Sequence, residues 1–142
     1  MATYSSRPVL SIGAAKQVAA AAIALAAQRA LKVAVAIVDD GGRLLYFERM
    51  DAVPWGSGDV ALGKAVSAAA YRRHTGVFDK RLSGGRLAVL GQPYAFPIEG
   101  GVPLVIDGHC VGAIGASGAL ATEDSELCEA GAAVLQEPTL HA

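Results

Sequence analysis

Residues 33–50 read VAVAIVDDGGRLLYFERM, a pattern typical of a β-hairpin. Val33 to Val38 is a compact run rich in β-branched side chains, and Arg43 to Met50 forms a second run. Asp40-Gly41-Gly42 stands between them, and an Asp-Gly turn between two such runs is a strong hairpin signal because glycine tolerates the backbone conformation that the turn needs. We therefore predict two neighbouring antiparallel strands.

A second hairpin is predicted near the other end of the chain. Pro103 to Ile106 and His109 to Ser117 flank another Asp-Gly turn, Asp107-Gly108. Hairpins rather than crossover helices join the strands in both cases, which favours an antiparallel sheet. The fold class that we expect is α/β of the α+β kind, in one domain over residues 1–142.

Three helices are predicted around these strands. Ser11 is the expected N-cap of the first, which runs to about Leu31, and its centre from Val18 to Ala27 has no polar face. A helix of that kind needs cover on more than one side, which we expect from the sheet and from a partner subunit. The other two helices are predicted from Ser57 to Arg73 or His74, and from Thr122 to about Gln136. The segment between the second helix and the second hairpin leaves room for a short strand.

The composition indicates a protein that associates with itself. Hydrophobic residues make up 53% of the chain and charged residues 18%, which leaves little polar surface for a small monomer. We therefore expect a homo-oligomer, from tetramer to octamer. The formal net charge of −1 argues against nucleic acid as a partner.

The sequence also predicts a cytoplasmic location. Met1 to Leu10 lacks a basic start followed by an apolar core, so we expect no signal peptide. Val18 to Ala27 is too short to span a bilayer, so no membrane partner is expected. Cys110 and Cys128 are too few for a disulfide framework and have no CxxC spacing, and no histidine pair has metal-site spacing. We expect reduced thiols and neither a structural nor a catalytic zinc site, and we assign no residues to a metal site.

The glycines Gly112, Gly115 and Gly118 follow a three-residue spacing within or at the end of a predicted strand. A dinucleotide-binding fingerprint needs a tight turn directly into a helix and then a parallel strand, and neither is predicted here. These glycines therefore indicate that a helix or a ligand approaches the sheet closely.

Lys64 falls among small residues on one stripe of the second helix. Its stripe neighbours at helical spacing are Ser57, Ala61, Ala68 and Tyr71. A lysine there must extend to water, pair with a carboxylate or face a polar cavity. The carboxylates that we expect as partners are Asp39, Glu48, Asp51 and Glu99. Two interpretations stay open, a structural ion pair and an ammonium that faces a ligand.

Three further groups have both a structural and a functional interpretation. The first group is Asp39, Arg49 and Asp51 at the ends of the first hairpin. These charged residues either belong to turns and the surface or form a site in which Arg49 clamps a carboxylate. His74 and Thr75 end the second helix, where a histidine either compensates the helix dipole or acts as a ligand or acid–base group. The loop from Tyr94 to Gly101 holds two aromatic side chains and a glycine pair expected to be mobile, so it either lines a pocket or seals the core.

Four segments, taken in order, resemble the GlcG/HbpS family of haem-binding, or haem-degrading, domains. They are VAIVDDGG at 35–42, ERMD at 48–51, the lysine-bearing helix from Gly63 through Thr75, and GGVPL at 100–104 with DG at 107–108 and VGAIGASG at 111–118. Together they cover nearly the whole chain. The family includes haem-binding proteins, the C-terminal domain of PduO-type cobalamin adenosyltransferases, and proteins encoded beside glycolate-oxidation or aromatic-degradation enzymes.

The resemblance implies a profilin-like fold, with a five-stranded antiparallel sheet flanked by helices on both faces, and homo-oligomers. It implies haem as the cofactor. The helix-ending threonine linked to haem contact in the family matches Thr75, the family lysine matches Lys64, and the Arg-Met-Asp motif matches Arg49 to Asp51. Some family members are secreted, whereas we expect no export signal for this chain.

Three functions follow as hypotheses. The first is an oligomeric protein that binds haem or a related small molecule in a pocket. The second is a cofactor-independent catabolic enzyme, an isomerase, hydratase or lyase that moves a proton on a small carboxylate or aromatic-degradation intermediate, with Lys64 binding an anion or acting as acid–base. The third is a structural oligomer with a vestigial pocket. The expected catalytic residues are Lys64, His74 and Glu99, and the expected ligand-binding residues are Asp39, Arg49, Asp51, Thr75, Tyr94, Phe96, Gly100 and Gly101.

Overall fold

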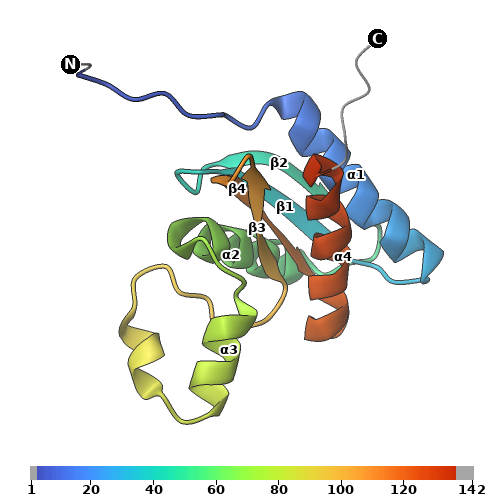
Figure 1. Ribbon diagram of the computed structural model, residues 1–142. Coiled ribbons are helices and arrows are strands. Elements are labelled where there is room, and N and C mark those ends of the chain that lie inside the picture. The colour runs from blue at the N-terminus through green and yellow to red at the C-terminus, as the bar shows by residue number, and fades with distance from the viewer. Residues whose placement is uncertain (1–2, 137–142) are drawn as a thin grey trace.

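The computed structural model in Figure 1 describes residues 3–136. The domain predicted over residues 1–142 therefore includes two ends that lie outside the described part. In chain order the elements are α1 (Ile12–Gln28), β1 (Ala34–Asp39), β2 (Leu44–Arg49), α2 (Trp55–Tyr71), α3 (Gly76–Ser83), a 3-10 helix (Leu87–Gly91), β3 (Gly101–Ile106), β4 (His109–Ser117), α4 (Ala121–Ala133) and a last 3-10 turn (Val134–Gln136).

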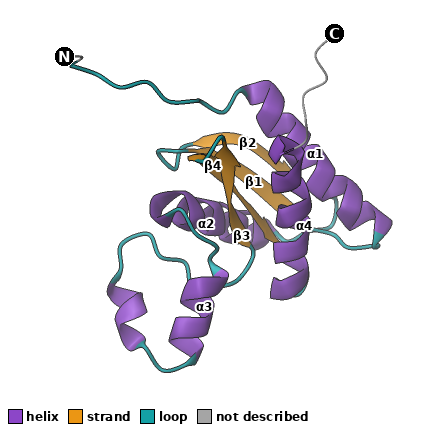
Figure 2. Ribbon diagram, viewed as in Figure 1, coloured by secondary structure: helices purple, strands orange, loops and turns teal. Residues whose placement is uncertain are grey.

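The strands form one sheet in the order β2-β1-β4-β3, and every neighbouring pair is antiparallel (Figure 2). Both predicted hairpins are confirmed. The expected fifth strand is wrong for residues 3–136, which contain four strands. Between α3 and β3 the chain instead forms a 3-10 helix and a loop. Pro93 and Pro97 lie in that loop, and a proline cannot donate a ladder hydrogen bond.

Helices cover both faces of the sheet, as expected (Figure 1). Alternate residues of β1 divide between two apolar clusters, because successive side chains of a strand point to opposite faces. Val35 and Ile37 join the cluster that contains α1 and α4, whereas Ala36 and Val38 join the cluster that contains α2. The buried run predicted around β1 thus belongs to a central strand covered on both sides. The mixed α/β class with an antiparallel sheet is confirmed.

Two of the three predicted helix starts differ from expectation. Ser11 caps α1 as predicted, accepting a hydrogen bond from the Ala14 backbone N–H at 3.1 Å. However, α2 begins at Trp55 after an extended Pro54, not at Ser57. α4 is capped at Leu120, whose N–H donates to the Glu123 carboxylate at 3.1 Å, so Thr122 is not the cap. A carboxylate three residues into a helix can reach back to the backbone N–H of the cap residue. Glu123 does so here, whereas the sequence predicts a cap by the Thr122 hydroxyl.

Within the chain, α4 supplies a second cover on the alanine-rich α1. On the opposite face α2 lies close against the sheet, and Gly115 makes this approach feasible. A Cβ atom on Gly115 would lie 2.1 Å from the Ala61 backbone oxygen of α2. The interpretation of these glycines as packing positions is confirmed for Gly115. None of the helices within residues 3–136 is both long and apolar enough to cross a membrane.

Candidate functional site

Lys64 forms a buried ion pair with Asp124 of α4. The Lys64 side chain is 2% exposed, and its Nζ donates to Asp124 Oδ2 at 3.2 Å and to the Ala116 backbone oxygen at 2.9 Å. The predicted partners Asp39, Glu48, Asp51 and Glu99 are wrong. Asp124 lies at the N-terminal end of the inward stripe of α4, followed by Leu127, Cys128 and Gly131. That helical spacing is the signal in the sequence that would have identified it.

Burial raises the pKa of the Asp124 carboxyl above its usual value, and the neighbouring Lys64 ammonium only partly offsets this effect. The second carboxylate oxygen accepts a hydrogen bond from the Ala119 backbone N–H at 3.1 Å. The pair therefore joins α2, the end of β4 and the start of α4 in one polar contact.

Thr75, Gly100 and Gly101 surround this pair. Thr75 is fully buried, and its backbone N–H and its hydroxyl oxygen both bond to Gly101, at 3.0 and 2.9 Å. Gly100 and Gly101 are buried as well, and the Gly101 backbone is hydrogen-bonded to Thr75. A Cβ atom on Gly100 would lie 2.7 Å from Lys64 Nζ, and a Cβ atom on Gly101 would lie 2.4 Å from the Lys64 backbone oxygen. The absence of side chains at these two positions leaves room for Lys64 and α2.

His74 immediately precedes the buried Thr75, and its side chain lies at the surface. α2 ends at Tyr71, earlier than predicted, because Arg72 adopts a left-handed conformation with φ of 52° that stops the helix. His74 follows in the connection to α3. Its side chain is 45% exposed, and its Nδ1 lies 3.4 Å from Glu129 Oε1 of α4.

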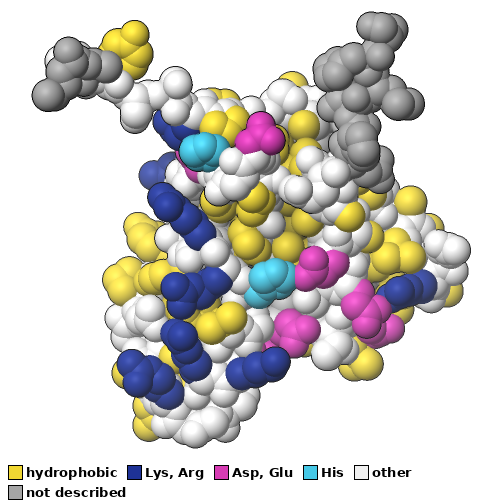
Figure 3. Space-filling view, in the orientation of Figure 1, with side chains coloured by type: hydrophobic (Ala, Val, Ile, Leu, Met, Phe, Trp, Pro, Cys, Tyr) yellow, Lys and Arg dark blue, Asp and Glu magenta, His cyan; other side chains and the backbone are white. Residues whose placement is uncertain are grey.

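Two depressions adjoin His74, and we call them together the His74 groove. One measures about 240 Å³ and also includes Val77, Lys80, Glu99 and Ser125. The other measures about 360 Å³ and includes Glu129 with apolar side chains of β3 and α4, among them Val102, Val105 and Ala132. On the face in Figure 3, histidine and acidic side chains lie side by side near the centre, below a hydrophobic area.

The predicted catalytic residues His74 and Glu99 thus share one depression, whereas Lys64 is beneath the surface. The Glu99 backbone N–H donates to Asp79 Oδ2 at 2.9 Å, which holds the end of the loop against α3. Sequence reasoning missed Lys80 and Glu129 as site residues. Neither residue belongs to a sequence motif. The packing of α3 and α4 places them in the depressions beside His74.

The predicted residues of the first hairpin lie away from the groove. Asp39 Oδ1 accepts hydrogen bonds from the Gly41 and Arg43 backbone N–H groups, both at 2.9 Å, so the carboxylate stabilises its own turn. Arg49 and Asp51 are exposed at and after the end of β2. β2 and β3 are opposite edges of the sheet, and the His74 groove lies against β3.

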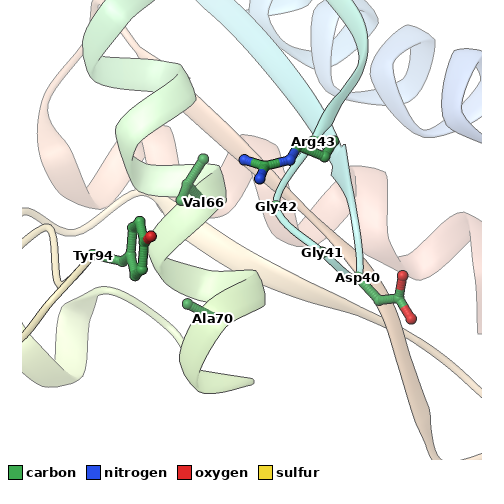
Figure 4. Close-up of a pocket in the computed structure, with 7 residues that line it drawn as sticks. All are labelled: Asp40, Gly41, Gly42, Arg43, Val66, Ala70 and Tyr94. Carbon is green, nitrogen blue, oxygen red and sulfur yellow. The ribbon is translucent and has the colours of Figure 1, made fainter.

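The two aromatic residues of the loop separate as well. Phe96 packs against Gly63 of α2, and its backbone N–H donates to Ser67 Oγ at 3.0 Å. Phe96 therefore seals the core, one of the two roles expected for the loop. Tyr94 is 73% exposed and lines a different cavity of about 180 Å³, between the β1–β2 turn and α2 (Figure 4).

Comparison with known proteins places the chain among haem-related relatives. The family model described as haem degrading protein HbpS-like matches residues 10–133. Protein GlcG of Escherichia coli strain K12 is 39% identical over 106 residues, which are 72% of this chain and 79% of GlcG.

Solved structures agree with that match. A double mutant of HbpS from Streptomyces reticuli has a TM-score of 0.84 at 32% identity, over 93% of this chain and 90% of that one. The PduOC:heme complex has a TM-score of 0.80 at 28% identity, over 89% of this chain and 94% of that one. Because the family model spans most of the chain and agrees with the fold, the chain belongs to the HbpS-like family.

Proposed function

We propose that this protein binds a small molecule in the His74 groove and that the ligand is haem. The observation that carries the proposal is the His74–Glu129 pair between two adjoining depressions. The likeness to the PduOC:heme complex supports haem as the ligand. The protein would act as a cytoplasmic homo-oligomer.

His74 would hold the haem iron, and Glu129 would support the imidazole. A histidine that binds metal through one ring nitrogen donates the N–H of the other to a carboxylate or carbonyl, which fixes the ring and raises its basicity. Glu129 Oε1 lies 3.4 Å from Nδ1 of His74, so Nε2 would be the nitrogen available to bind iron. Histidine is also among the usual axial ligands of haem.

The walls of the groove suit the rest of a haem molecule. Val102, Val105 and Ala132 give the second depression an apolar lining for the porphyrin, and Lys80 in the first offers an ammonium to a propionate carboxylate. Bound haem would supply an iron centre, and His74 with its polar neighbours would adjust the reactivity of that iron.

The buried residues below the groove would act as positioning residues. The Thr75–Gly101 hydrogen bonds fix the residue next to His74, and the Lys64–Asp124 pair fixes α4, which carries Glu129. Thr75 would then influence haem through the position of His74, since its hydroxyl is already bonded inside the fold. The enzymatic alternative, with Lys64 as acid–base, requires the buried pair to open.

Self-association is supported by large apolar side chains that are exposed in the isolated chain. Trp55, Leu87 and Leu90 are 75%, 69% and 68% exposed. Monomeric proteins seldom leave many such side chains in water, whereas subunit interfaces bury them. Light scattering coupled to gel filtration measures the assembly; a monomer at micromolar concentration contradicts this part of the proposal.

Titration of the purified protein with haemin tests the haem site. We expect a saturable change of the Soret band for the wild type and for His109→Ala, a matched histidine variant outside the groove. His74→Ala should shift the band and weaken binding. Glu129→Gln should weaken binding by about 10-fold or more, as for other carboxylates that support a metal-bound histidine. No saturable change in the wild type, or equal behaviour of both histidine variants, overturns the proposal.

A further inference from the structure

The cavity beside the β1–β2 turn is separate from the His74 groove and combines one cation with one aromatic ring. Arg43 and the Gly41-Gly42 backbone form one side, Val66 and Ala70 of α2 form the floor, and Tyr94 stands opposite. In Figure 4 the Arg43 guanidinium extends toward Val66, and Tyr94 lies on the far side of Val66. We propose that this cavity binds a small planar carboxylate, an aromatic or conjugated acid.

Arg43 supplies a charge that the fold leaves uncompensated. Within residues 3–136 the ion pairs are those of Arg7, Arg29, Lys64 and His74, so Arg43 takes part in none of them. The carboxylate among the lining residues, that of Asp40, points away from the cavity in Figure 4 and binds Arg7 at 2.6 Å. A guanidinium with a planar fork and no protein partner matches a carboxylate in a bidentate manner.

The backbone of Arg43 is held in place by hydrogen bonds within the turn. Its backbone N–H donates to Asp39 Oδ1 at 2.9 Å, and its backbone oxygen accepts from the Asp39 N–H at 2.8 Å. Gly42 has a φ of 76°, a conformation that glycine adopts readily and that keeps the turn tight. The cation therefore projects from a rigid turn, so ligand binding costs little ordering entropy in the backbone.

Tyr94 is held over the cavity by a strained and anchored loop. Its φ is 65°, in the left-handed region that a bulky residue rarely adopts. The Tyr71 hydroxyl donates to the Pro93 backbone oxygen on one side, and the Phe96 N–H donates to Ser67 on the other. Strain of this kind persists where the surroundings impose it, and it is common at ligand sites. The result is an exposed ring presented across an apolar floor.

These features select the ligand class. A flat apolar body fits over Val66 and Ala70 with one end against the Tyr94 ring, while its carboxylate reaches Arg43. The volume of about 180 Å³ limits the ligand to a small acid. An inorganic anion would use Arg43 alone and leave the apolar floor and the ring without a partner.

Benzoate is the probe for this site, and the chemical shifts of the Gly41 and Gly42 amides measure its binding by NMR. We expect saturable shifts in the wild type and weaker binding of acetate, which lacks the ring, and of benzyl alcohol, which lacks the charge. Arg43→Gln should weaken benzoate by about tenfold or more, the usual effect of losing a hydrogen-bonded charge. Tyr94→Asn removes the ring but tolerates the left-handed backbone, and it should weaken benzoate more than acetate.

Two control variants keep the test specific. Arg86→Gln makes the same charge change at an exposed arginine outside this cavity and should leave benzoate binding unchanged. His74→Ala should also leave it unchanged, because the two sites are separate. The proposal is overturned if benzoate fails to saturate, if acetate binds as tightly as benzoate, if Arg86→Gln weakens binding as much as Arg43→Gln, or if His74→Ala abolishes it.

Discussion

The buried Lys64–Asp124 pair predicts a large and strongly coupled effect on stability. The two side chains are 2% and 3% exposed, and Nζ lies 3.2 Å from Oδ2. At that separation the attraction is about 5 kcal/mol for an effective dielectric constant near 20, and the cost of removing both charges from water is of similar size. The intact pair therefore contributes little net stability, but breaking it leaves one buried charge without a partner.

Asp124→Asn and Lys64→Met each break the pair while preserving most of the side-chain volume. Either change should lower the free energy of unfolding by about 3–5 kcal/mol, because one charge stays buried. For a chain of this length the loss corresponds to a fall in Tm of roughly 10 °C or more. The double variant Lys64→Met/Asp124→Leu replaces both charges by apolar groups and should lie within about 2 kcal/mol of the wild type.

Urea unfolding followed by circular dichroism at pH 7 measures all four proteins, and the double-mutant cycle isolates the coupling between the two residues. The expected result is that the double variant loses far less than the sum of the two single losses. Single losses below about 1 kcal/mol that simply add would contradict a closed, buried pair. Such a result would mean that the pair opens in solution, and Lys64 would again be available to a ligand.

Three further predictions follow from packing and from titration. Because burial raises the pKa of the Asp124 carboxyl, the folded state binds its proton more tightly than the unfolded chain does. The contribution of this carboxyl to stability should therefore fall as pH rises from the ordinary pKa of Asp through the raised pKa. Urea unfolding at a series of pH values measures this fall, which should be missing in Asp124→Asn. Gly115→Ala should lower stability by about 3 kcal/mol, because the new Cβ would meet the backbone of α2, whereas Gly91→Ala, with open space around it, should leave thermal unfolding nearly unchanged. Iodoacetamide should label the half-buried Cys110 and spare Cys128 in the folded protein, since burial raises the pKa of the Cys128 thiol; mass spectrometry reads the modified peptides, and equal labelling would contradict the buried position.

The features predicted correctly are those that a short segment of sequence specifies. The run from Val33 to Val38 and its Asp-Gly turn predict a hairpin from local propensity alone, and the sheet confirms it. Ser11 caps α1 through a residue three positions later, which is equally local. The close packing at Gly115 was also predictable, because a glycine inside a strand often marks the place where another backbone approaches the sheet.

The features missed are contacts between distant segments. Lys64 and Asp124 are 60 positions apart, so the residues pointed to a buried cation but not to its partner. The sequence indicates His74 as a candidate but not Glu129, because only the packing of α4 against β3 brings that carboxylate to the imidazole. The sequence predicts Tyr94 and Glu99 in one pocket, but Phe96 between them packs against α2, and the two residues line different cavities.

The proposed haem site depends on His74 as the ligand of the iron, and rescue by imidazole is its sharpest test. We predict that His74→Ala loses the Soret position of the wild-type haemin complex and that millimolar imidazole restores it, because the free ligand replaces the missing side chain at the iron. Circular dichroism of the variant checks that the fold is intact. If the wild type and His74→Ala give the same Soret band with haemin, or if imidazole changes both complexes equally, His74 is not the axial ligand and the groove does not bind haem in the proposed way.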